Sequence, residues 1–580
     1  VMTERKWFSP HDGKRRIGSL LDVSATEAKI NLSIAGAGDH AWILGNRLPA
    51  GEVNEFVFLD CGQLSVLARV VKVWLESGER LSVDGLDDSK PKNNPIGLVQ
   101  LLVSVDVETG YNHKGIKQHP KLGAQVYAAH PELVSMLAEG GLSEDQASLQ
   151  LPVAEMPHDS SVSIHITPEK LFARHCAVLG STGGGKSYTM ANLIENVYRF
   201  GGKVFLLDAT GEFAGLPCTS YYVGDHPNAD ATNKVTYPHW MFTDSDMRAL
   251  LRPSAQSQAP KLESAIQSLR VVTQFYQNPN HGLPISPSYT LIKQGNSKAP
   301  FEAAVGSIST SFQSTPWSFS ALSSQIIEEC VWPNGGSASS PRPEIWGGRA
   351  DNDVGHCLNL VSRIQAMAGN PHLEWMIDCD HQLLTIPKLI EDLSSSVKPE
   401  IVRLDLSAIP FEASAREILV NAIGRKLLSC ARHSEISYKN PLLVFIDEAH
   451  QFLNKHVGDE GSRFSLDAFG NIAKEGRKYG LNVVIATQRP RDVPEDVLSQ
   501  IGTLIVHRLT NEKDQEVVKK AVGSIDQRSA SFLPVLGQGE ALLLGVDFPF
   551  PMTVRIKAPD NKPVSRSASF SSVWRQMQGP

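Results

Sequence analysis

The sequence predicts an α/β protein: a parallel sheet flanked by helices and preceded by a small β-barrel. Three observations indicate this fold class. Short apolar runs alternate with helix-like segments from about residue 160 to residue 535, as strands joined by crossover helices do. One of these runs leads into the glycine-rich segment 180–187 and then into a helical pattern. Before residue 150, short β-branched and aromatic runs recur between turn residues, which favours a barrel.

Residues 1–150 are expected to form this barrel. Ile30, Leu32 and Ile34 alternate with polar residues, and later runs are rich in Val, Leu and Phe. These later runs are residues 56–59, 66–75 and 98–107. No chemically active cluster is present among them, so we expect a module that serves assembly or guides a substrate.

Two stretches, 151–239 and 400–535, are expected to form the parallel-sheet domain. Residues 240–399 interrupt them with a polar segment whose helix-like pieces predict an inserted helical subdomain. Residues 536–580 are expected to add a β-like piece and a polar tail. The apolar runs of strand length in the sheet domain are residues 176–179, 203–207, 400–405, 441–446, 481–486 and 503–506, and residues 414–430 have a helical pattern.

Composition excludes several classes of protein. Hydrophobic residues make up 41% and charged residues 20% of the 580 residues, as in an ordinary soluble protein. The net charge of −7 argues against a protein that coats nucleic acid non-specifically. The seven cysteines include no Cys-x-x-Cys pair, so we expect neither a zinc site nor a disulfide framework. With no apolar stretch long enough to span a bilayer, we expect a cytoplasmic protein with no membrane partner.

Residues 180–187, Gly-Ser-Thr-Gly-Gly-Gly-Lys-Ser, fit the eight-residue phosphate-loop pattern. In this pattern the backbone N–H groups and a helix N-terminus surround a polyphosphate. Lys186 is expected to reach the β- and γ-phosphates, and the Ser187 hydroxyl to ligate Mg²⁺. A chance glycine-rich turn is the alternative. The helix after the loop should bury one face, formed by Met190, Leu193, Ile194 and Val197.

The sequence therefore predicts a nucleoside triphosphate bound with Mg²⁺. The expected nucleotide-binding residues are Gly180, Ser181, Thr182, Gly183, Gly184, Gly185, Lys186, Ser187 and Tyr188.

Carboxylates follow two of the predicted strands. Asp447 and Glu448 come directly after the run 442–446. A carboxylate at this position suits Mg²⁺, and the adjacent Glu448 is expected to polarise the attacking water. Asp208 and Glu212 are further candidates for the Mg²⁺ or water network, with a turn-forming role as the alternative. A solvated acidic turn is the alternative for Asp447 and Glu448.

Three further polar residues are candidates for phosphate chemistry. Gln488 lies at the end of the strand that begins with the apolar run 481–486. It is expected to contact the γ-phosphate or its water, with a capping role as the alternative. Arg477, within the basic patch 474–478, is a candidate for an arginine that reaches the nucleotide of a neighbouring subunit. A solvated helix face is the alternative for that patch. Arg174, just before the phosphate-loop strand, is a second candidate for the same role.

These motifs in this order resemble the HerA/FtsK group of RecA-like motor ATPases, and most closely the HerA family of bacterial type. The sequence around residue 20 is similar to the small β-barrel of that family, called the HAS barrel. Residues 536–557, with Gly539, Glu540 and Pro551, resemble its C-terminal brace strand. The motifs that carry the resemblance are residues 174–187, 208–213, 444–450, 475–480 and 486–490.

The resemblance implies a homohexameric ring that hydrolyses ATP and moves double-stranded DNA through its channel. On this interpretation Arg477 is the trans-acting arginine, Gln488 the γ-phosphate sensor and Glu448 the catalytic base. The family implies a partner supplied as a separate chain, either a nuclease or a sirtuin-type effector, in DNA end processing or anti-phage defence. No septal membrane pump is expected, because no transmembrane segment is present.

Two other interpretations remain open at this point. No helix-turn-helix, RNP-type strand or zinc finger is present, so a ring scaffold that uses nucleotide to assemble an effector is the alternative. A coupling ATPase of conjugation or secretion is the third, and it would need a membrane anchor. In the Ser-rich tail 558–580, Phe570 and Trp574 would share a face of a short helix and could dock on a partner, with disorder as the alternative.

Overall fold

The described part of the chain divides into two compact units. The computed structural model describes residues 8–32, 42–43, 46–47, 51–75, 94–113, 115–140, 149–276, 282–307, 315–337, 339–377, 379–410, 414–453, 456–457, 464–521, 527–546, 548–564, 570 and 574. The first unit is Val1–Arg199, Ala486–Arg491 and Ser499–Lys562. The second unit is Phe200–Ile485, Asp492–Leu498 and Pro563–Pro580.

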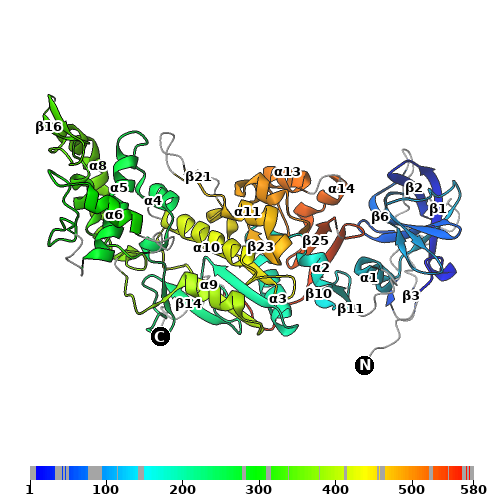
Figure 1. The fold of residues 1–580 in the computed structure, drawn as a ribbon. Helices are drawn as coiled ribbons and strands as arrows, with labels where there is room; N and C mark the ends of the chain where they lie inside the picture. Colours follow the sequence, from blue (N-terminus) through cyan, green and yellow to red (C-terminus); the bar gives the residue numbers. More distant parts are fainter. Residues whose placement is uncertain are drawn as a thin grey trace. The chain divides into compact units, whose positions relative to one another are not determined.

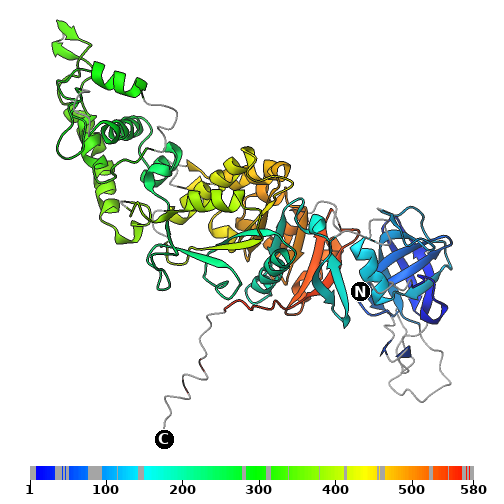
Figure 2. The ribbon, with the colours of Figure 1, turned by 60° about the horizontal axis from the view of Figure 1, so that its bottom comes forward.

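The N-terminal part of the first unit is a closed antiparallel barrel (Figures 1 and 2). Its strands pair in the order β2-β1-β9-β5-β6-β7-β8, and pairing of β2 with β7 closes six of them into a ring. The strands are β1 (Arg16–Val23), β2 (Glu27–Leu32), β5 (Phe56–Cys61), β6 (Leu64–Trp74), β7 (Ile96–Asp106), β8 (Asn112–His113) and β9 (Gln125–Ala128). A separate hairpin joins β3 (Trp42–Ile43) to β4 (Asn46–Arg47). The predicted barrel is confirmed; the predicted Ile34 lies outside the described residues.

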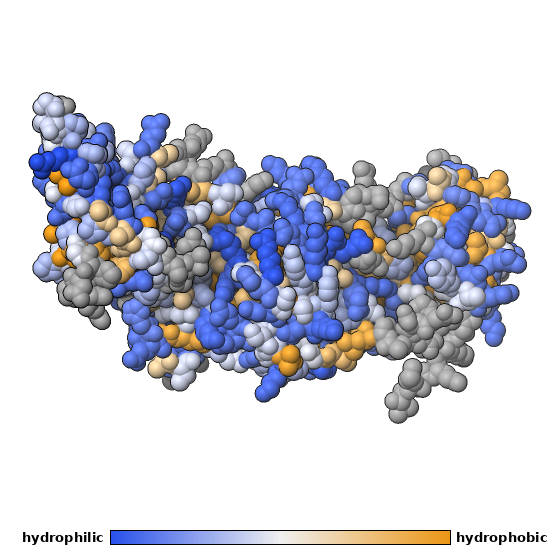
Figure 3. All heavy atoms as spheres, in the orientation of Figure 1, coloured by the Kyte–Doolittle hydropathy of each residue, from blue (hydrophilic) through white to orange (hydrophobic). Residues whose placement is uncertain are grey.

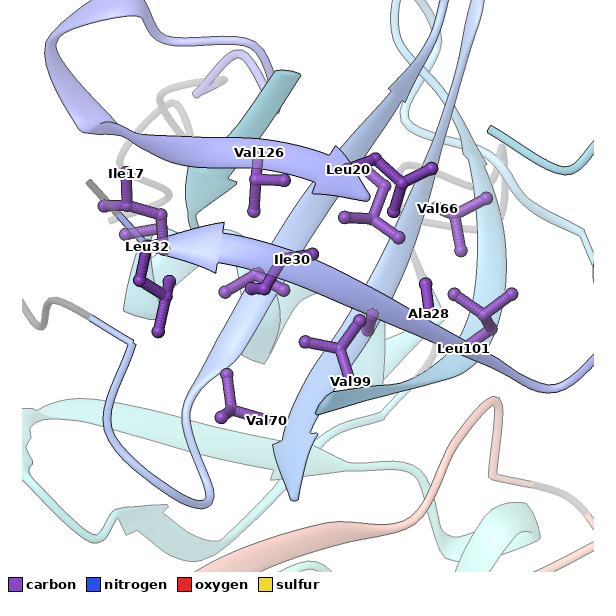
Figure 4. Close-up of a cluster of buried hydrophobic side chains, with 14 residues drawn as sticks. Ile17, Leu20, Ala28, Ile30, Leu32, Val66, Val70, Val99, Leu101 and Val126 are labelled. Atoms are coloured by element: carbon purple, nitrogen blue, oxygen red, sulfur yellow. The ribbon is translucent and has the colours of Figure 1, made fainter. Parts of the chain in front are cut away.

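Alternating apolar residues fill the barrel interior. Ile17 and Leu20 of β1, Ile30 of β2 and Val99 of β7 point into one cluster (Figure 4). Each apolar side chain removed from water contributes about 25 cal/mol per Å² to stability. A β-bulge between Leu20 and Asp22 turns the next residue, Leu21, outward, where its side chain is 46% exposed. The barrel core therefore depends on the alternation of buried and exposed side chains along its strands, which this bulge interrupts in β1.

The rest of the first unit is a mixed sheet with the order β11-β10-β26-β25-β24-β12. β12 and β24 are parallel, whereas the other neighbours are antiparallel. The strands are β10 (Leu151–Met156), β11 (Asp159–Ile166), β12 (Cys176–Leu179), β24 (Thr503–Val506), β25 (Glu540–Gly545) and β26 (Met552–Ile556). The helices are α1 (Pro131–Glu139), α2 (Pro168–Phe172), α3 (Lys186–Arg199), α13 (Glu512–Ala521) and α14 (Gln527–Ala530).

Helix α3 packs on this sheet through the face that the sequence predicts. Met190, Leu193, Ile194 and Val197 are all buried, so the predicted helical period is confirmed. Polar residues on another side of α3 hold the C-terminal segment: Glu195 accepts hydrogen bonds from the backbone N–H groups of residues 560 and 561.

The second unit contains a parallel sheet of order β23-β20-β13-β19-β14-β15-β18. Every pairing between neighbours in this order is parallel, as alternating strands and helices predict. The strands are β13 (Lys203–Asp208), β14 (Thr219–Val223), β15 (Lys234–Thr236), β18 (Leu384–Thr385), β19 (Glu400–Asp405), β20 (Leu442–Ile446) and β23 (Leu481–Thr487), whose last two residues belong to the first unit. The remaining strands form the hairpins β16 (Gly335–Ser337) with β17 (Ser340–Arg342) and β21 (His456–Val457) with β22 (Phe464–Ser465).

Helices dominate the segment between β15 and β19. Figures 1 and 2 show α5, α6 and α8 gathered in one bundle within the second unit. β18 also lies within the segment 240–399, yet it pairs with β15, so the sheet extends into the region where only helices were expected. The helices of the unit are α4 (Asp244–Leu251), α5 (Gln258–Phe275), α6 (Ala299–Ser307), α7 (Leu322–Glu328), α8 (Asp351–Ala368), α9 (Ile386–Ser395), α10 (Ala415–Arg432), α11 (Ala468–Glu475) and α12 (Glu495–Leu498).

The surface and the cysteines agree with the composition. Hydrophilic residues predominate over α10 and α11 on the face shown in Figure 3. All seven cysteines are free thiols in this structure. Within the described ranges, every helix is too short or too polar to cross a bilayer. In the tail, the rings of Phe570 and Trp574 lie 5.3 Å apart, and the other residues from 565 onward lie outside the described residues.

Leu20→Ala is expected to lower the free energy of unfolding by about 2–5 kcal/mol, because it leaves a cavity in the barrel core. The neighbouring Leu21→Ala is the matched control and should change it by no more than about 0.5 kcal/mol, because Leu21 is a half-exposed surface residue. Urea denaturation of the full chain measures both changes. Equal effects of the two substitutions would contradict the placement of the core.

Candidate functional site

The loop between β12 and α3 has the shape of a phosphate cradle. Gly183 and Gly185 have φ angles of 75° and 116°, a region that side chains with a β-carbon rarely enter. The buried Lys186 folds over the loop, and its Nζ donates to the Ser181 carbonyl at 3.3 Å. The N–H of Thr189 donates to Gly185, so α3 begins directly at the loop. A glycine-rich turn, a lysine beside it and a helix that begins at the turn are the features that a polyphosphate-binding loop requires.

Two residues from other strand ends contact this loop. The Thr182 hydroxyl donates to Gln488 Oε1 at 2.6 Å. The Ser181 N–H and hydroxyl both donate to the Arg508 carbonyl, each at 2.9 Å. The structure thus brings together two predicted site residues, Thr182 and Gln488, that are 306 positions apart. Arg508, with its side chain exposed, is a neighbour of the loop that the sequence analysis missed.

A histidine lies beneath the loop. His507 directly follows β24 and is buried, with its Nδ1 2.8 Å from the Glu540 carbonyl and its Nε2 2.7 Å from the Thr189 hydroxyl. A β-carbon added to Gly180 would lie 2.6 Å from the His507 Cβ. Burial, opposed by the bond to Glu540 and reinforced by Lys186, lowers the pKa of His507 to about 4. The imidazole is therefore neutral at pH 7.

In the second unit, three aspartates meet at the carboxyl ends of adjacent strands. Asp208 of β13 lies opposite Asp405 of β19 in register, and Asp447 directly follows β20 on the other side of β13. Arg403 bridges the first two, with its Nε 2.7 Å from Asp208 and its Nη2 2.6 Å from Asp405. All four side chains are buried. One guanidinium therefore pairs with two of the three carboxylates.

The Asp208 carboxylate organises the turn that follows β13. Its Oδ1 accepts from the N–H groups of Thr210 and Gly211, and its Oδ2 accepts from Phe213 and Arg403. These four bonds favour the turn-forming interpretation of Asp208 over direct ligation of Mg²⁺. The turn in turn places the Thr210 hydroxyl 3.3 Å from Asp447 Oδ2, to which it donates.

Asp447 is a buried carboxyl with acidic neighbours. Burial, followed by the charges of Asp208, Glu448 and Glu212, raises the pKa of the Asp447 carboxyl well above its usual value. A cation would relieve this repulsion. Within the described ranges, no group of three or more His, Cys, Asp or Glu side chains is arranged to hold a metal ion. The residues therefore fit Mg²⁺, which binds through one or two carboxylates together with phosphates and water, better than a metal held by protein alone.

Glu448 has a left-handed backbone, with φ 45° and ψ 46°, which is uncommon for a side chain of this size. Its Oε2 lies 3.2 Å from His450 Nδ1, on the short 3-10 helix Ala449–Gln451. Strained backbone of this kind is frequent at functional sites. The strained backbone therefore places the Glu448 side chain directly after Asp447, close to His450.

The two candidate arginines lie at the other ends of their strands. Arg477 lies in the 3-10 helix Gly476–Tyr479, before β23 begins, and its side chain is exposed. The basic patch thus occupies the end of α11 and this 3-10 helix, rather than one continuous helix. Arg174 precedes β12, and Gly502 leaves room for its side chain. Each arginine therefore lies at the amino end of its strand, whereas the phosphate loop follows the carboxyl end of β12 and Asp447 follows the carboxyl end of β20.

Two family models match the chain. The model described as "Helicase HerA, central domain" matches residues 151–315, and the model described as "Helicase HerA-like C-terminal" matches residues 436–571. Together they span about half of the chain.

Curated relatives and solved structures are similar over longer stretches. The DNA double-strand break repair helicase HerA of Saccharolobus solfataricus is 23% identical over 412 residues, which are 70% of this chain and 69% of that protein. The protein of the same name from Pyrococcus furiosus is 25% identical over 449 residues, 75% of this chain and 73% of that protein. Among solved structures, the bacterial conjugative coupling protein TrwBdeltaN70 matches 75% of this chain and 94% of its own, with a TM-score of 0.43 and 12% identity.

The contribution of Asp447 to the free energy of unfolding of the Mg²⁺-free protein is expected to decline as the pH rises above about 4, because the raised pKa of Asp447 makes ionisation costlier in the folded state. Asp447→Asn should remove part of this decline. Mg²⁺ should restore stability at pH 8 in the wild type and not in the variant. Denaturant titrations at several pH values measure these changes. Asp351→Asn is the control, since that side chain is 86% exposed. Identical pH profiles for wild type and Asp447→Asn would contradict this account.

Proposed function

Because this chain belongs to the HerA family of P-loop ATPases, we propose that it is a motor that hydrolyses ATP to move double-stranded DNA. The observation that carries the proposal is the loop between β12 and α3, whose Lys186 and Gln488 both lie against the phosphate cradle. We further propose that the working form is a homohexamer, that it is cytoplasmic, and that it serves a nuclease or other effector supplied as a separate chain.

Each half of the catalytic machinery has its own task. Lys186 and the loop N–H groups bind the phosphates, and Ser187 with Asp447 would hold Mg²⁺. That ion, when bound, neutralises charge on the phosphate oxygens. Glu448 accepts the proton of the attacking water, and its place directly after Asp447 at the end of β20 supports this role. Phosphoryl transfer needs little beyond such positioning and charge stabilisation.

Two residues complete the proposal for the chemistry. Gln488 senses the γ-phosphate, since its amide oxygen already contacts Thr182 of the loop. Arg477 stabilises the transition state on a neighbouring subunit, with Arg174 as the second candidate. Their exposed positions before the amino ends of β23 and β12 support a role in trans, and a trans-acting arginine accelerates such reactions by about 10³–10⁵.

DNA as the substrate is supported by the relatives, which are named as DNA double-strand break repair helicases. The net charge of −7 favours binding confined to a local basic surface over coating of the whole protein. The same charge also supports a second candidate function: a ring scaffold that uses ATP to assemble an effector, without translocation. DNA end processing and anti-phage defence are the two settings that we propose for either function.

Linear duplex DNA is expected to stimulate ATP turnover of the purified full chain several-fold, in a species of hexamer mass. Lys186→Ala should lower turnover by at least about 100-fold, as loss of a transition-state donor does. Lys388→Ala, whose ammonium is 58% exposed, is the matched control and should behave as wild type. Turnover that is indifferent to DNA, or that starts only when another protein is added, would support the scaffold instead. No turnover under any of these conditions would contradict both functions.

Arg477→Ala is expected to lower turnover by about 10³-fold or more without loss of the oligomer. The neighbouring substitution Lys478→Ala is the matched control and should leave turnover close to that of the wild type. Mixing Arg477→Ala with Lys186→Ala subunits should restore part of the activity, because hybrid interfaces pair an intact arginine with an intact phosphate loop. Steady-state turnover across mixing ratios, with mass measured in parallel, tests this. Intact mixed oligomers that remain inactive would show that Arg477 does not act in trans.

A further inference from the structure

The space beneath the phosphate loop is filled by one imidazole. His507 directly follows β24, and its backbone still pairs with β12, because its N–H donates to the Leu179 carbonyl at 2.7 Å. The ring then extends under the loop, where its Cε1 would lie 3.0 Å from a β-carbon added to Gly185. A β-carbon on Gly184 would lie 3.3 Å from the His507 Cβ. Three glycines of the motif therefore face this one side chain: Gly180, Gly184 and Gly185.

Both ring nitrogens are committed. The Glu540 carbonyl can only accept a hydrogen bond, so Nδ1 carries the proton. Nε2 is then the acceptor of a hydrogen bond that the Thr189 hydroxyl donates. A neutral imidazole with both bonds made is the state that burial favours, and loss of either partner would leave a buried polar atom unpaired.

The two partners belong to different parts of the fold. Thr189 lies in the first turn of α3, two residues after Ser187. Glu540 begins β25, the strand that pairs with β24 on the side away from β12. The Glu540 side chain also accepts the N–H of Gly537 at 2.8 Å, which fixes the turn that leads into β25. His507 thus joins the start of the loop helix to a strand from the C-terminal end of the chain.

We propose that His507 is a positioning residue of the nucleotide site, holding the phosphate loop in its binding shape by linking Thr189 of α3 to Glu540 of β25. The inference rests on the proposed function, because it concerns how tightly this loop binds a nucleotide. It makes nucleotide affinity depend on β25, a strand that contributes no residue of the phosphate-loop motif.

The experiment compares ATP affinity, KM and kcat for the wild type and four full-length variants. Thr189→Val keeps the shape of the side chain and removes one bond to His507, and should weaken ATP binding about fivefold, as the loss of one hydrogen bond does. His507→Phe keeps a ring and removes both bonds, and should weaken binding at least about tenfold. The effect should fall mainly on KM, because neither side chain touches the reacting atoms. The double variant should bind no more weakly than His507→Phe alone, because the Thr189 bond is already absent.

His239→Phe is the matched control. That histidine is also buried and neutral, with its nitrogens 3.3 Å and 2.7 Å from the Met376 and Trp317 carbonyls, but it belongs to the second unit. The substitution His239→Phe should lower the melting temperature of the protein and leave its ATP affinity within twofold of that of the wild type. If His507→Phe does not fold, the milder Thr189→Val decides the matter alone.

ATP affinity of Thr189→Val within twofold of wild type would overturn the inference. So would an equal loss of affinity in His239→Phe, since the effect would then be general destabilisation. A wild type that binds no ATP would overturn the proposed function itself, whereas variants that bind as well as a competent wild type overturn only the role of His507.

Discussion

Repulsion among carboxylates at one edge of the parallel sheet is the constraint on which the candidate catalytic residues of the second unit depend. Because neighbouring parallel strands end at the same edge, Asp208 and Asp405 face each other in register, and Asp447 follows the next strand. Arg403 pairs with the first two, and breaking such a buried pair costs about 3–5 kcal/mol. Asp447 accepts a hydrogen bond from the Thr210 hydroxyl, and burial with the acidic neighbours raises the pKa of its carboxyl. A cation bound at this edge would relieve the repulsion that makes it costly.

The sequence was sufficient where structure follows from local pattern. The glycines and Lys186 of the phosphate loop, the buried face of α3 and the strand before Asp447 all lie in short segments whose periodicity and composition predict them. The closed barrel was also predictable, because its strands follow one another between turns, although the bulge beside Leu21 was not. Elements whose partners are near in sequence leave a local signal, and the structure confirms the predicted barrel, the strand and the buried face of α3.

Residues that act through strand order could not be found in this way. His507 is an isolated histidine at the end of an apolar run, and only the pairing of β24 with β12 brings it beneath the loop. Arg403 lies inside a strand, where a charged residue gives no sign of the two aspartates that it neutralises. Asp208 illustrates the opposite limit, since the sequence left two roles open and four hydrogen bonds favour the turn. Which strands are neighbours is set by tertiary packing, which one sequence does not display.

The bond between Ser181 and Arg508 also has a consequence for biosynthesis, because the two residues are 327 positions apart. At about 5–20 residues per second, translation needs roughly 15–65 s to progress from one to the other. The barrel strands end at Ala128, so all partners within the barrel have been synthesised before that period begins. The phosphate loop has to wait for β24 and then for β25, and pairings between such distant segments form slowly. A nascent chain therefore carries a folded N-terminal domain on the ribosome long before it can complete the loop.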